Sequence, residues 1–347
     1  MSENRTELAE YGEFQLIQHL TKNVANLQPS THVGVGDDAA VLDMGAGHFS
    51  LVSTDMLVEG VHFDLSYAPL EHLGYKAVIS NVSDICAMNG VCEHITVSIA
   101  VSNRFSVQAL EALYRGIKHA CDRYRVDLVG GDTTSSSSGL VISVTAHGRV
   151  LKENLSLRSG AKEKDILVVT GNLGAAYMGL QILEREKSVF TDAPQVQPDL
   201  SGHDYILERQ LKPEARVDIV HQLLEKGVVP SSMIDISDGL ASEIFHLGSQ
   251  SKLGCHLYEE KIPIDPKTYE TARSFEMDPT LCALSGGEDY EILFTVTPEQ
   301  YEEIMDLPDI VAIGYMADAG SGFNMETKDG HVVPIKAQGW DHMIKED

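Results

Sequence analysis

Several features that identify a protein class are missing from this sequence. No run of apolar residues approaches the roughly 18 that a membrane-spanning helix needs, and the polar residues 1–5 contain no secretory core. The 5 cysteines form no C-x-x-C pair, which argues against a disulfide framework and a zinc knuckle. We therefore expect free thiols and a cytoplasmic protein without a membrane partner.

Positive charge is also scarce. Only 26 lysines and arginines accompany 52 aspartates and glutamates, so the formal net charge is −26. Nucleic acid is excluded as a partner, because its phosphates need Lys and Arg to displace their counterions. Most of the acidity can be a solvated surface that favours solubility, but acids inside glycine-rich or apolar segments need another explanation.

The familiar phosphate-binding and hydrolytic motifs are absent too. The chain has no G-x-x-x-x-G-K-[ST] loop, no H-R-D or D-F-G triplet, no H-E-x-x-H and no G-x-S-x-G. An enzyme of this sequence that acted on phosphates would have to rely on metal ions instead of a P-loop lysine.

What the sequence does contain is a series of carboxylates placed beside glycines or hydroxyl groups. Six segments have this character: Gly34 to Ala39, Ser53-Thr54-Asp55, Asn81 to Asp84, Gly130 to Thr134, Asp235 to Leu240, and Ser285 to Glu291. Each alone can be an acidic turn, a strand-end turn, a helix cap or a hairpin. Carboxylate and hydroxyl oxygens are the ligands that Mg²⁺ prefers, and together the six segments predict one metal–phosphate site.

The segment from Gly34 to Ala39 also fits the dinucleotide pattern G-x-G-x-x-A. We reject that interpretation, because a pyrophosphate would face two carboxylates and the following residues indicate a strand instead of a helix. Two carboxylates about 4 Å apart repel by about 4 kcal/mol at an effective dielectric of 20, so Asp37 and Asp38 together favour a divalent cation. Neighbouring side chains in extended backbone point to opposite sides, and the role of Asp37 therefore stays open.

Asp84 lies in a predicted helix that is otherwise mostly apolar. Lys76, Ser80 and Asp84 recur at every fourth residue, which places them on one helix face. A buried Asp84 needs a cation or a basic neighbour, since an unpaired charge is costly to bury.

Apolar periodicity predicts helices and strands in both halves of the chain. The expected helices are 6–22, 69–88 with Gly90 as C-cap, 106–123, about 175–186, one after Pro213 and one from Gly239. The expected strands are 49–54, 58–63, 95–101, 126–129, 140–150, 166–170 and 233–236, with a hinge at 158–162 and a loop at 187–204. This mixture predicts an α+β fold of two domains, 1–150 and 151–347, of which the first is strand-rich.

Taken together, these strings resemble the thiamine-monophosphate kinase family, in the superfamily that includes aminoimidazole ribonucleotide synthetase. Further matching strings are Gly12-Glu13-Phe14-x-Leu16-Ile17, Met56 to Phe63, Lys76-Ala77, Arg158-Ser159-Gly160-Ala161 and Gly339-Trp340-Asp341-His342. The resemblance implies an aminoimidazole ribonucleotide synthetase-like fold that dimerises through its N-terminal domain. It also implies ATP-dependent phosphorylation of thiamine monophosphate to thiamine diphosphate with several Mg²⁺ ions.

The resemblance assigns roles by matching position. The implied Mg²⁺ ligands are Asp38, Ser53, Thr54, Asp55, Asp84, Asp132, Asp235 and Asp238. The implied nucleotide contacts are Tyr114, Gly131, Asp132, Arg158 and Ser237, and the implied substrate contacts are His62, Glu288 and Trp340. Trp340 suits a cationic thiazolium through cation–π contact, and Glu288 could offset its charge. The acceptor phosphate is largely ionised at neutral pH, so we predict no general base.

Two rival functions remain. The first is a sister enzyme of the same superfamily acting on another ATP-activated substrate. A selenophosphate synthetase is expected to carry an N-terminal cysteine or selenocysteine with a lysine, and a hydrogenase-maturation carbamoyl dehydratase is expected to end in a reactive cysteine, whereas this chain ends in residues 343–347 without one. The second rival is a non-catalytic, acidic protein that binds metal or nucleotide.

Overall fold

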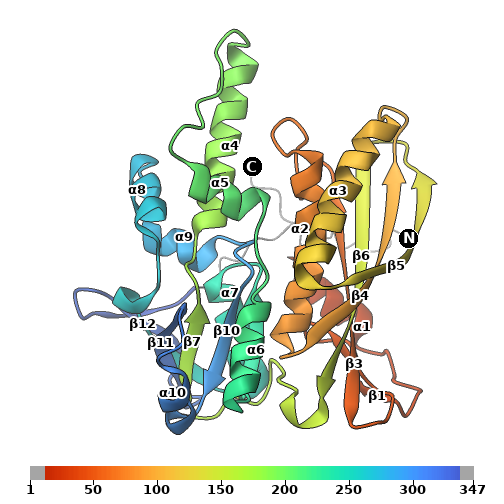
Figure 1. Cartoon of the computed structure of the whole chain (residues 1–347). Helices are drawn as coiled ribbons and strands as arrows, with labels where there is room; N and C mark the ends of the chain where they lie inside the picture. The colour runs from red at the N-terminus through yellow and green to blue at the C-terminus, as the bar shows by residue number, and fades with distance from the viewer. Residues whose placement is uncertain (1–11, 337–347) are drawn as a thin grey trace, which may run out of the picture.

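The computed structural model describes residues 12–336, which form two β-sheets with helices packed against them (Figure 1). The first sheet has six strands in the order β1-β2-β3-β6-β4-β5. These strands are β1 Thr31–Val33, β2 Ala40–Asp43, β3 His48–Val58, β4 Val91–Val101, β5 Asp127–Ser135 and β6 Leu140–Leu151. Every pairing is antiparallel except that of β4 with β5.

Two long helices, α2 (Leu70–Ala87) and α3 (Val107–Tyr124), cover one face of this sheet. The alternation of β6 explains the arrangement: Leu140, Ile142 and Val144 are buried, and the residues between them are more exposed. We call the opposite side, which includes Thr54 and Met56, the open face of the first sheet. The short helix α1 spans Gly12–Thr21.

The second sheet has seven strands in the order β13-β12-β9-β11-β7-β10-β8. They are β7 Ile166–Thr170, β8 Ser232–Ile236, β9 Gly254–Tyr258, β10 Glu291–Val296, β11 Ile310–Ala317, β12 Phe323–Glu326 and β13 Val332–Pro334. The helices of this half are α4 Ala175–Asp192, α5 Asp204–Leu211, α6 Val217–Lys226, α7 Leu240–Ser251, α8 Pro266–Ser274, α9 Pro279–Ser285 and α10 Pro298–Ile304. The α+β prediction is confirmed.

Helix α2 joins the two halves. It is buried on nearly every side, as expected for a helix that is apolar all round. One continuous hydrophobic core contains residues of α2 and also Met233 of β8 and Phe294 of β10. The polar residues of α2 therefore lie at the junction between the halves, and the Ser83 hydroxyl donates to Asp235 of β8 at 2.7 Å.

Four local predictions were wrong. Residues 59–63 form a turn in which the His62 amide donates to the Val58 carbonyl, so β3 is not followed by another strand. Asn89, with φ +56°, takes the left-handed position after α2 that we gave to Gly90. Helix α4 continues to Asp192, so the predicted 187–204 loop begins as helix.

The fourth error concerns the glycine pair of β5. We expected the strand to end at residue 129, before the Gly130-Gly131 pair, but β5 runs through both residues. A Cβ on Gly131 would lie 1.8 Å from the Val97 carbonyl oxygen of β4. Glycine is thus needed here for the close approach of two strands.

Among the helices of residues 12–336, none combines the length and the apolar composition that a membrane span requires.

Candidate functional site

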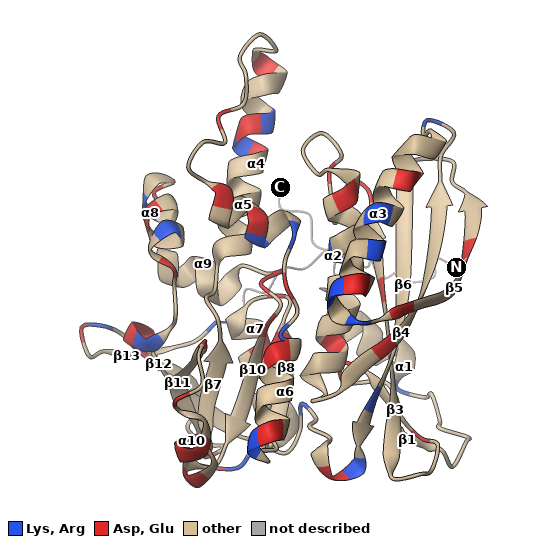
Figure 2. Cartoon of the chain, in the orientation of Figure 1, with Lys and Arg blue, Asp and Glu red and all other residues tan. Residues whose placement is uncertain are grey.

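Two adjoining cavities lie where α2 meets the second sheet. The larger has a volume of about 1090 Å³ and the smaller about 540 Å³. Both are lined by Thr54, Asp55, Asp84, Asp235, Ser237 and Asp238. The acidic segments after β8 and before β10 face α2 across this junction (Figure 2). The structure therefore brings together acids that are far apart in the sequence.

Three carboxylates form a compact cluster. One oxygen from each of Asp38, Asp84 and Asp235 lies within 4.8 Å of the others. Asp38 precedes β2, Asp84 lies on α2 and Asp235 lies on β8. The hydroxyls of Ser53 and Ser83 donate to Asp84 and Asp235 respectively, and so fix the orientation of two of the three groups.

The environment of this cluster disfavours negative charge. Burial, together with neighbouring carboxylates, raises the pKa of Asp84 well above its usual range and that of Asp235 to about 8. Burial also raises the pKa of Asp55 to about 6. Asp38 Oδ2 is buried and accepts no hydrogen bond within the described part of the chain. Clustered carboxylate oxygens of this kind fit a hard divalent cation, which would favour their ionised form.

Arg158 and Asp37 lie beside the cluster. Arg158 Nη2 is 2.6 Å from Asp38 Oδ1. The Asp37 carboxylate instead accepts the backbone N–H of Arg158 at 3.1 Å and that of Asp38 at 3.0 Å. Burial, together with the Asp38 charge, raises the pKa of Asp37 to about 7. Asp37 thus holds the segment that carries Arg158 and is not part of the three-carboxylate cluster.

The larger cavity also contains two of the predicted substrate contacts. His62 accepts the Val58 amide through Nδ1 at 3.0 Å. Glu288 Oε1 lies 2.7 Å from Lys76 Nζ, and Glu288 Oε2 accepts from Gln210 Nε2 at 2.9 Å. The negative charge of Glu288 is therefore already paired with a lysine. The third predicted substrate contact, Trp340, lies outside the described residues.

Three predicted nucleotide contacts lie elsewhere. Gly131 and Asp132 are on β5 and Tyr114 is on α3, and none of them lines either cavity. Strand β5 is separated from β3 by β4 and β6, which corresponds to about 14 Å across the sheet. Asp132 pairs with Ser98 of β4, so its side chain lies on the same open face as that of Thr54.

Thr54 itself is turned away from the cluster. Its hydroxyl donates to the Val144 carbonyl at 3.1 Å and lies 3.0 Å from the Thr145 hydroxyl of β6. The side chains of Ser53 and Asp55 point to the α2 side, where they bond Asp84 and Ser80 respectively, as the strand alternation requires. The segment Ser53-Thr54-Asp55 of β3 therefore presents side chains to both faces of the first sheet.

Sequence reasoning missed several polar side chains at this junction. They are Lys76, Ser83, Gln210, Glu243 and Tyr290. Lys76 had a sequence signal, the four-residue spacing that it shares with Asp84, and Ser83 and Tyr290 lie within two of the six acidic segments, which assigned them no role. Glu243 is buried and accepts the Asp238 amide at 3.0 Å, and burial followed by the Asp238 charge raises its pKa. No pattern in the sequence distinguished Gln210 from an ordinary helical glutamine.

Comparison with known proteins adds independent findings. Residues 36–150 match the family model described as AIR synthase related protein, N-terminal domain. A thiamine-monophosphate kinase of Bacillus subtilis is 33% identical over 339 residues, which cover 95% of this chain and 99% of that protein.

Two solved structures resemble the chain over its length. One, named AaThiL complexed with AMPPCP and TMP, has a TM-score of 0.82 and 30% identity, and covers 98% of this chain and 100% of that one. The other, thiamine monophosphate kinase from Aquifex aeolicus, has a TM-score of 0.74 and 29% identity, and covers 95% of this chain and 100% of that one.

Proposed function

The chain belongs to the thiamine-monophosphate kinase family, and from this premise we propose that it transfers the γ-phosphoryl group of ATP to thiamine monophosphate. The products are thiamine diphosphate and ADP. The observation that carries the proposal is the pair of cavities with a shared carboxylate wall. The smaller contains Arg158, a predicted nucleotide contact, and the larger contains His62 and Glu288, two predicted substrate contacts.

We assign the metal site of this reaction to the carboxylate cluster. Asp38, Asp84 and Asp235 hold Mg²⁺ in this proposal, with Asp55, Asp238 and Ser53 beside them. When bound, Mg²⁺ neutralises phosphate charge and orients donor and acceptor. Ser53 and Ser83 keep two of the carboxylates in place.

Other side chains act on the phosphates and on the acceptor. Arg158 offers a guanidinium that binds phosphate oxygens through charge-assisted hydrogen bonds, and Asp37 fixes the backbone from which it extends. Ser237 lines both cavities and suits a nucleotide contact. The acceptor is a phosphate that is already ionised, so the chain needs to position it and requires no general base.

We further propose a homodimer in which the partner completes this site. Asp132 and Thr54 share the open face of the first sheet, but their strands lie about 14 Å apart. Strand β5 is exposed along its whole length and pairs with β4 on one side only. A partly apolar edge strand whose other side is unpaired favours association with a second chain. The region 1–150 then forms the dimerising domain, 151–347 forms the second domain, and the partner subunit's Asp132 approaches Thr54 and Asp55.

Mixing two inactive variants tests the shared site. Asp132→Asn and Asp235→Asn remove a carboxylate from β5 and from β8 respectively. If the partner supplies Asp132, subunit exchange in an equal mixture restores about one quarter of wild-type activity, because half of the dimers are mixed and each has one intact site. An inactive mixture, with exchange verified by mass spectrometry of differently tagged subunits, would contradict the proposal.

The cytoplasm is the location that we propose for this activity. All 5 cysteines are free and buried, as expected in a reducing compartment.

Product analysis tests the proposed function. Purified protein with ATP, Mg²⁺ and thiamine monophosphate is expected to form thiamine diphosphate and ADP in equal amounts. Unphosphorylated thiamine is expected to be inert, because it lacks the ionised acceptor. A non-catalytic binding protein would bind ATP and form no product, and a sister enzyme would hydrolyse ATP only with a different co-substrate. Either outcome would overturn the assignment.

A further inference from the structure

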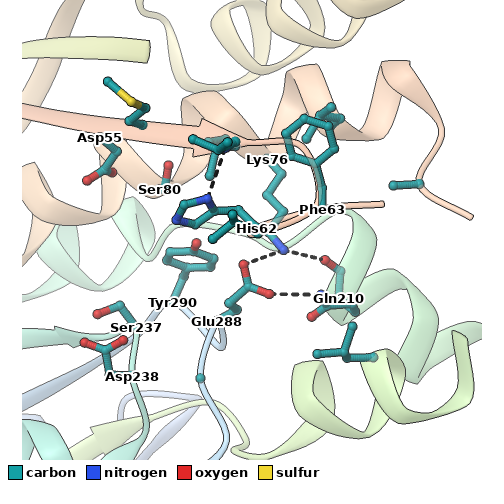
Figure 3. Close-up of a pocket in the computed structure, with 18 of the residues that line it drawn as sticks. Asp55, His62, Phe63, Lys76, Ser80, Gln210, Ser237, Asp238, Glu288 and Tyr290 are labelled. Carbon is teal, nitrogen blue, oxygen red and sulfur yellow. Dashed lines mark hydrogen bonds and ion pairs between the residues drawn. The ribbon is translucent and has the colours of Figure 1, made fainter. Parts of the chain in front are cut away.

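Three polar side chains meet at the end of the larger cavity that is remote from the carboxylates (Figure 3). Lys76 Nζ lies 2.7 Å from Glu288 Oε1 and donates to the Gln210 backbone carbonyl at 3.2 Å. Gln210 Nε2 donates to Glu288 Oε2 at 2.9 Å. We call Lys76, Gln210 and Glu288 the polar trio. Its members come from α2, α5 and the loop before β10, so only the folded chain assembles it.

The backbone around Glu288 is held in an unfavourable conformation. Glu288 has φ +66° and Tyr290 has φ +52°, both in the left-handed region that non-glycine residues rarely adopt. Asp289, between them, is fully buried and accepts the Gly174 amide at 2.6 Å. Arg209 donates to the Asp289 carbonyl at 3.1 Å. Strain of this kind persists at functional sites whose surroundings enforce it, and here it directs Glu288 into the cavity.

Helix α2 sets the distance between the polar trio and the carboxylate cluster. Lys76, Ser80 and Asp84 follow one another on one helix face, and all three line the cavity. Eight residues of α-helix separate Lys76 from Asp84, which corresponds to about 12 Å. His62 and Tyr290 lie between the two ends (Figure 3). A substrate whose phosphate reaches the carboxylate cluster therefore extends its far end toward the trio.

Charge pairing decides which part of the substrate the trio can recognise. Glu288 is paired with Lys76, so it does not provide an unbalanced negative charge for a cationic thiazolium. Instead the trio offers hydrogen-bonding groups. A lysine has three N–H donors, and two of them have the partners named above. Gln210 Oε1 is buried and accepts no hydrogen bond from any described residue.

The two rings of thiamine monophosphate differ in what they offer. The thiazolium carries the phosphate and has neither an N–H donor nor a free ring-nitrogen acceptor. The aminopyrimidine is attached on the other side of the thiazolium and has an amino group and two ring nitrogens. Apolar and aromatic side chains of Phe63, Tyr67, Tyr177 and Leu211 line the same cavity and can enclose a flat ring.

We propose that the polar trio recognises the aminopyrimidine ring, and that Lys76 and Gln210 set substrate specificity by holding Glu288 in position. This inference rests on the proposed function. Lys76 and Gln210 are positioning residues for Glu288, whose carboxylate is the group that accepts from the ring. Glu288 is thus a hydrogen-bonding group and not the counter-ion of the thiazolium that we first expected.

The test compares two ligands that differ only at this ring. The first is thiamine monophosphate, and the second is its N-benzyl analogue, which keeps the phosphate and the cationic thiazolium but replaces the aminopyrimidine with a benzene ring. Dissociation constants are measured by calorimetry for the wild type and for Lys76→Met. We expect Lys76→Met to weaken binding of thiamine monophosphate about 10- to 100-fold, the range for a lost charge-assisted hydrogen bond. Binding of the benzyl analogue, which offers the trio no hydrogen-bonding group, is not expected to weaken, and the KM for ATP is expected to stay at the wild-type value.

Two further variants separate recognition from general damage. Gln210→Leu keeps the Lys76–Glu288 pair. It is expected to weaken binding of thiamine monophosphate selectively, but less than Lys76→Met does. Lys212→Met removes a nearby lysine that lies over the Tyr75 ring at 4.9 Å and outside the cavity, and is expected to bind both ligands as the wild type does. Thermal unfolding verifies that each variant is folded.

The outcomes are distinct. An equal loss for both ligands in Lys76→Met, or no loss for either, would overturn the assignment of the aminopyrimidine to the trio. A wild-type protein that binds thiamine monophosphate but forms no thiamine diphosphate would overturn the proposed function and leave the ring assignment standing.

Discussion

The three-carboxylate cluster predicts an unusual effect of Asp235→Asn, in which stability rises while function is lost. One oxygen of Asp235 lies within 4.8 Å of oxygens from Asp38 and Asp84. At that distance and an effective dielectric of 20, each ionised pair repels by about 3.5 kcal/mol. Partial protonation and the nearby Arg158 reduce this repulsion. We therefore expect the metal-free variant to gain about 2 kcal/mol, in the range of stabilising substitutions at functional sites.

The same cluster predicts a pH dependence. Burial raises the pKa of Asp235 to about 8 in the folded protein, from 3.8 in an unperturbed aspartate. The folded protein keeps this proton at a pH where the unfolded chain has already released it, so stability declines as the pH rises toward 8. Without metal, the wild type is expected to lose stability between pH 6 and pH 8, and the variant is expected to lose less.

Thermal unfolding in EDTA at several pH values measures both effects. For a chain of this length, about 2 kcal/mol corresponds to a rise of about 3 °C in Tm. Adding Mg²⁺ is expected to raise the Tm of the wild type more than that of Asp235→Asn, because ligand binding stabilises the state that binds it. Asp306→Asn, on the exposed α10–β11 connection, is the matched control. It is expected to leave the Tm, its pH dependence and its response to Mg²⁺ at wild-type values. A metal-free Asp235→Asn that is less stable than the wild type, with an unchanged pH slope, would refute the reasoning.

Three further substitutions test separate parts of the site. Asp132→Asn is expected to reduce kcat about 100-fold or more with no change in Tm, since Asp132 is exposed on β5; wild-type turnover would exclude it as a ligand. Asp37→Ala is expected to raise the KM for ATP about tenfold with kcat nearly retained, because it releases the Arg158 backbone; an unchanged KM would contradict that role. Gly131→Ala is expected to lower the free energy of unfolding by about 2 kcal/mol, because a Cβ would meet the Val97 carbonyl; chemical denaturation measures it, and an unchanged midpoint would argue against the close approach.

Much of the convergence of acids could be predicted from the sequence. Asp38, Asp84 and Asp235 each stand beside glycine, hydroxyl or apolar residues, where an isolated surface acid is not expected. The helical spacing of Lys76 and Asp84 also placed them correctly on one face of α2. These signals are local, and local periodicity is what a single sequence reports best.

The remaining features depend on long-range pairing. Gly130-Gly131 indicated the end of a strand, because glycine marks both strand ends and close strand contacts, and only the pairing with β4 distinguishes the two. The distance between Asp132 and the cluster follows from the strand order, which places β5 at the sheet edge. The Lys76–Glu288 pair joins α2 to the loop before β10, and neither segment alone indicates the other. The ligand and contact roles of these residues stay predictions until they are measured.

Phosphorus NMR tests the central claim of metal-assisted transfer between two phosphates most directly. With purified protein, ATP, Mg²⁺ and thiamine monophosphate, the γ-phosphorus signal of ATP is expected to fade as the diphosphate signals of thiamine diphosphate grow in equal amount. EDTA is expected to stop both changes. Release of inorganic phosphate without thiamine diphosphate, or transfer that continues in EDTA, would contradict the account.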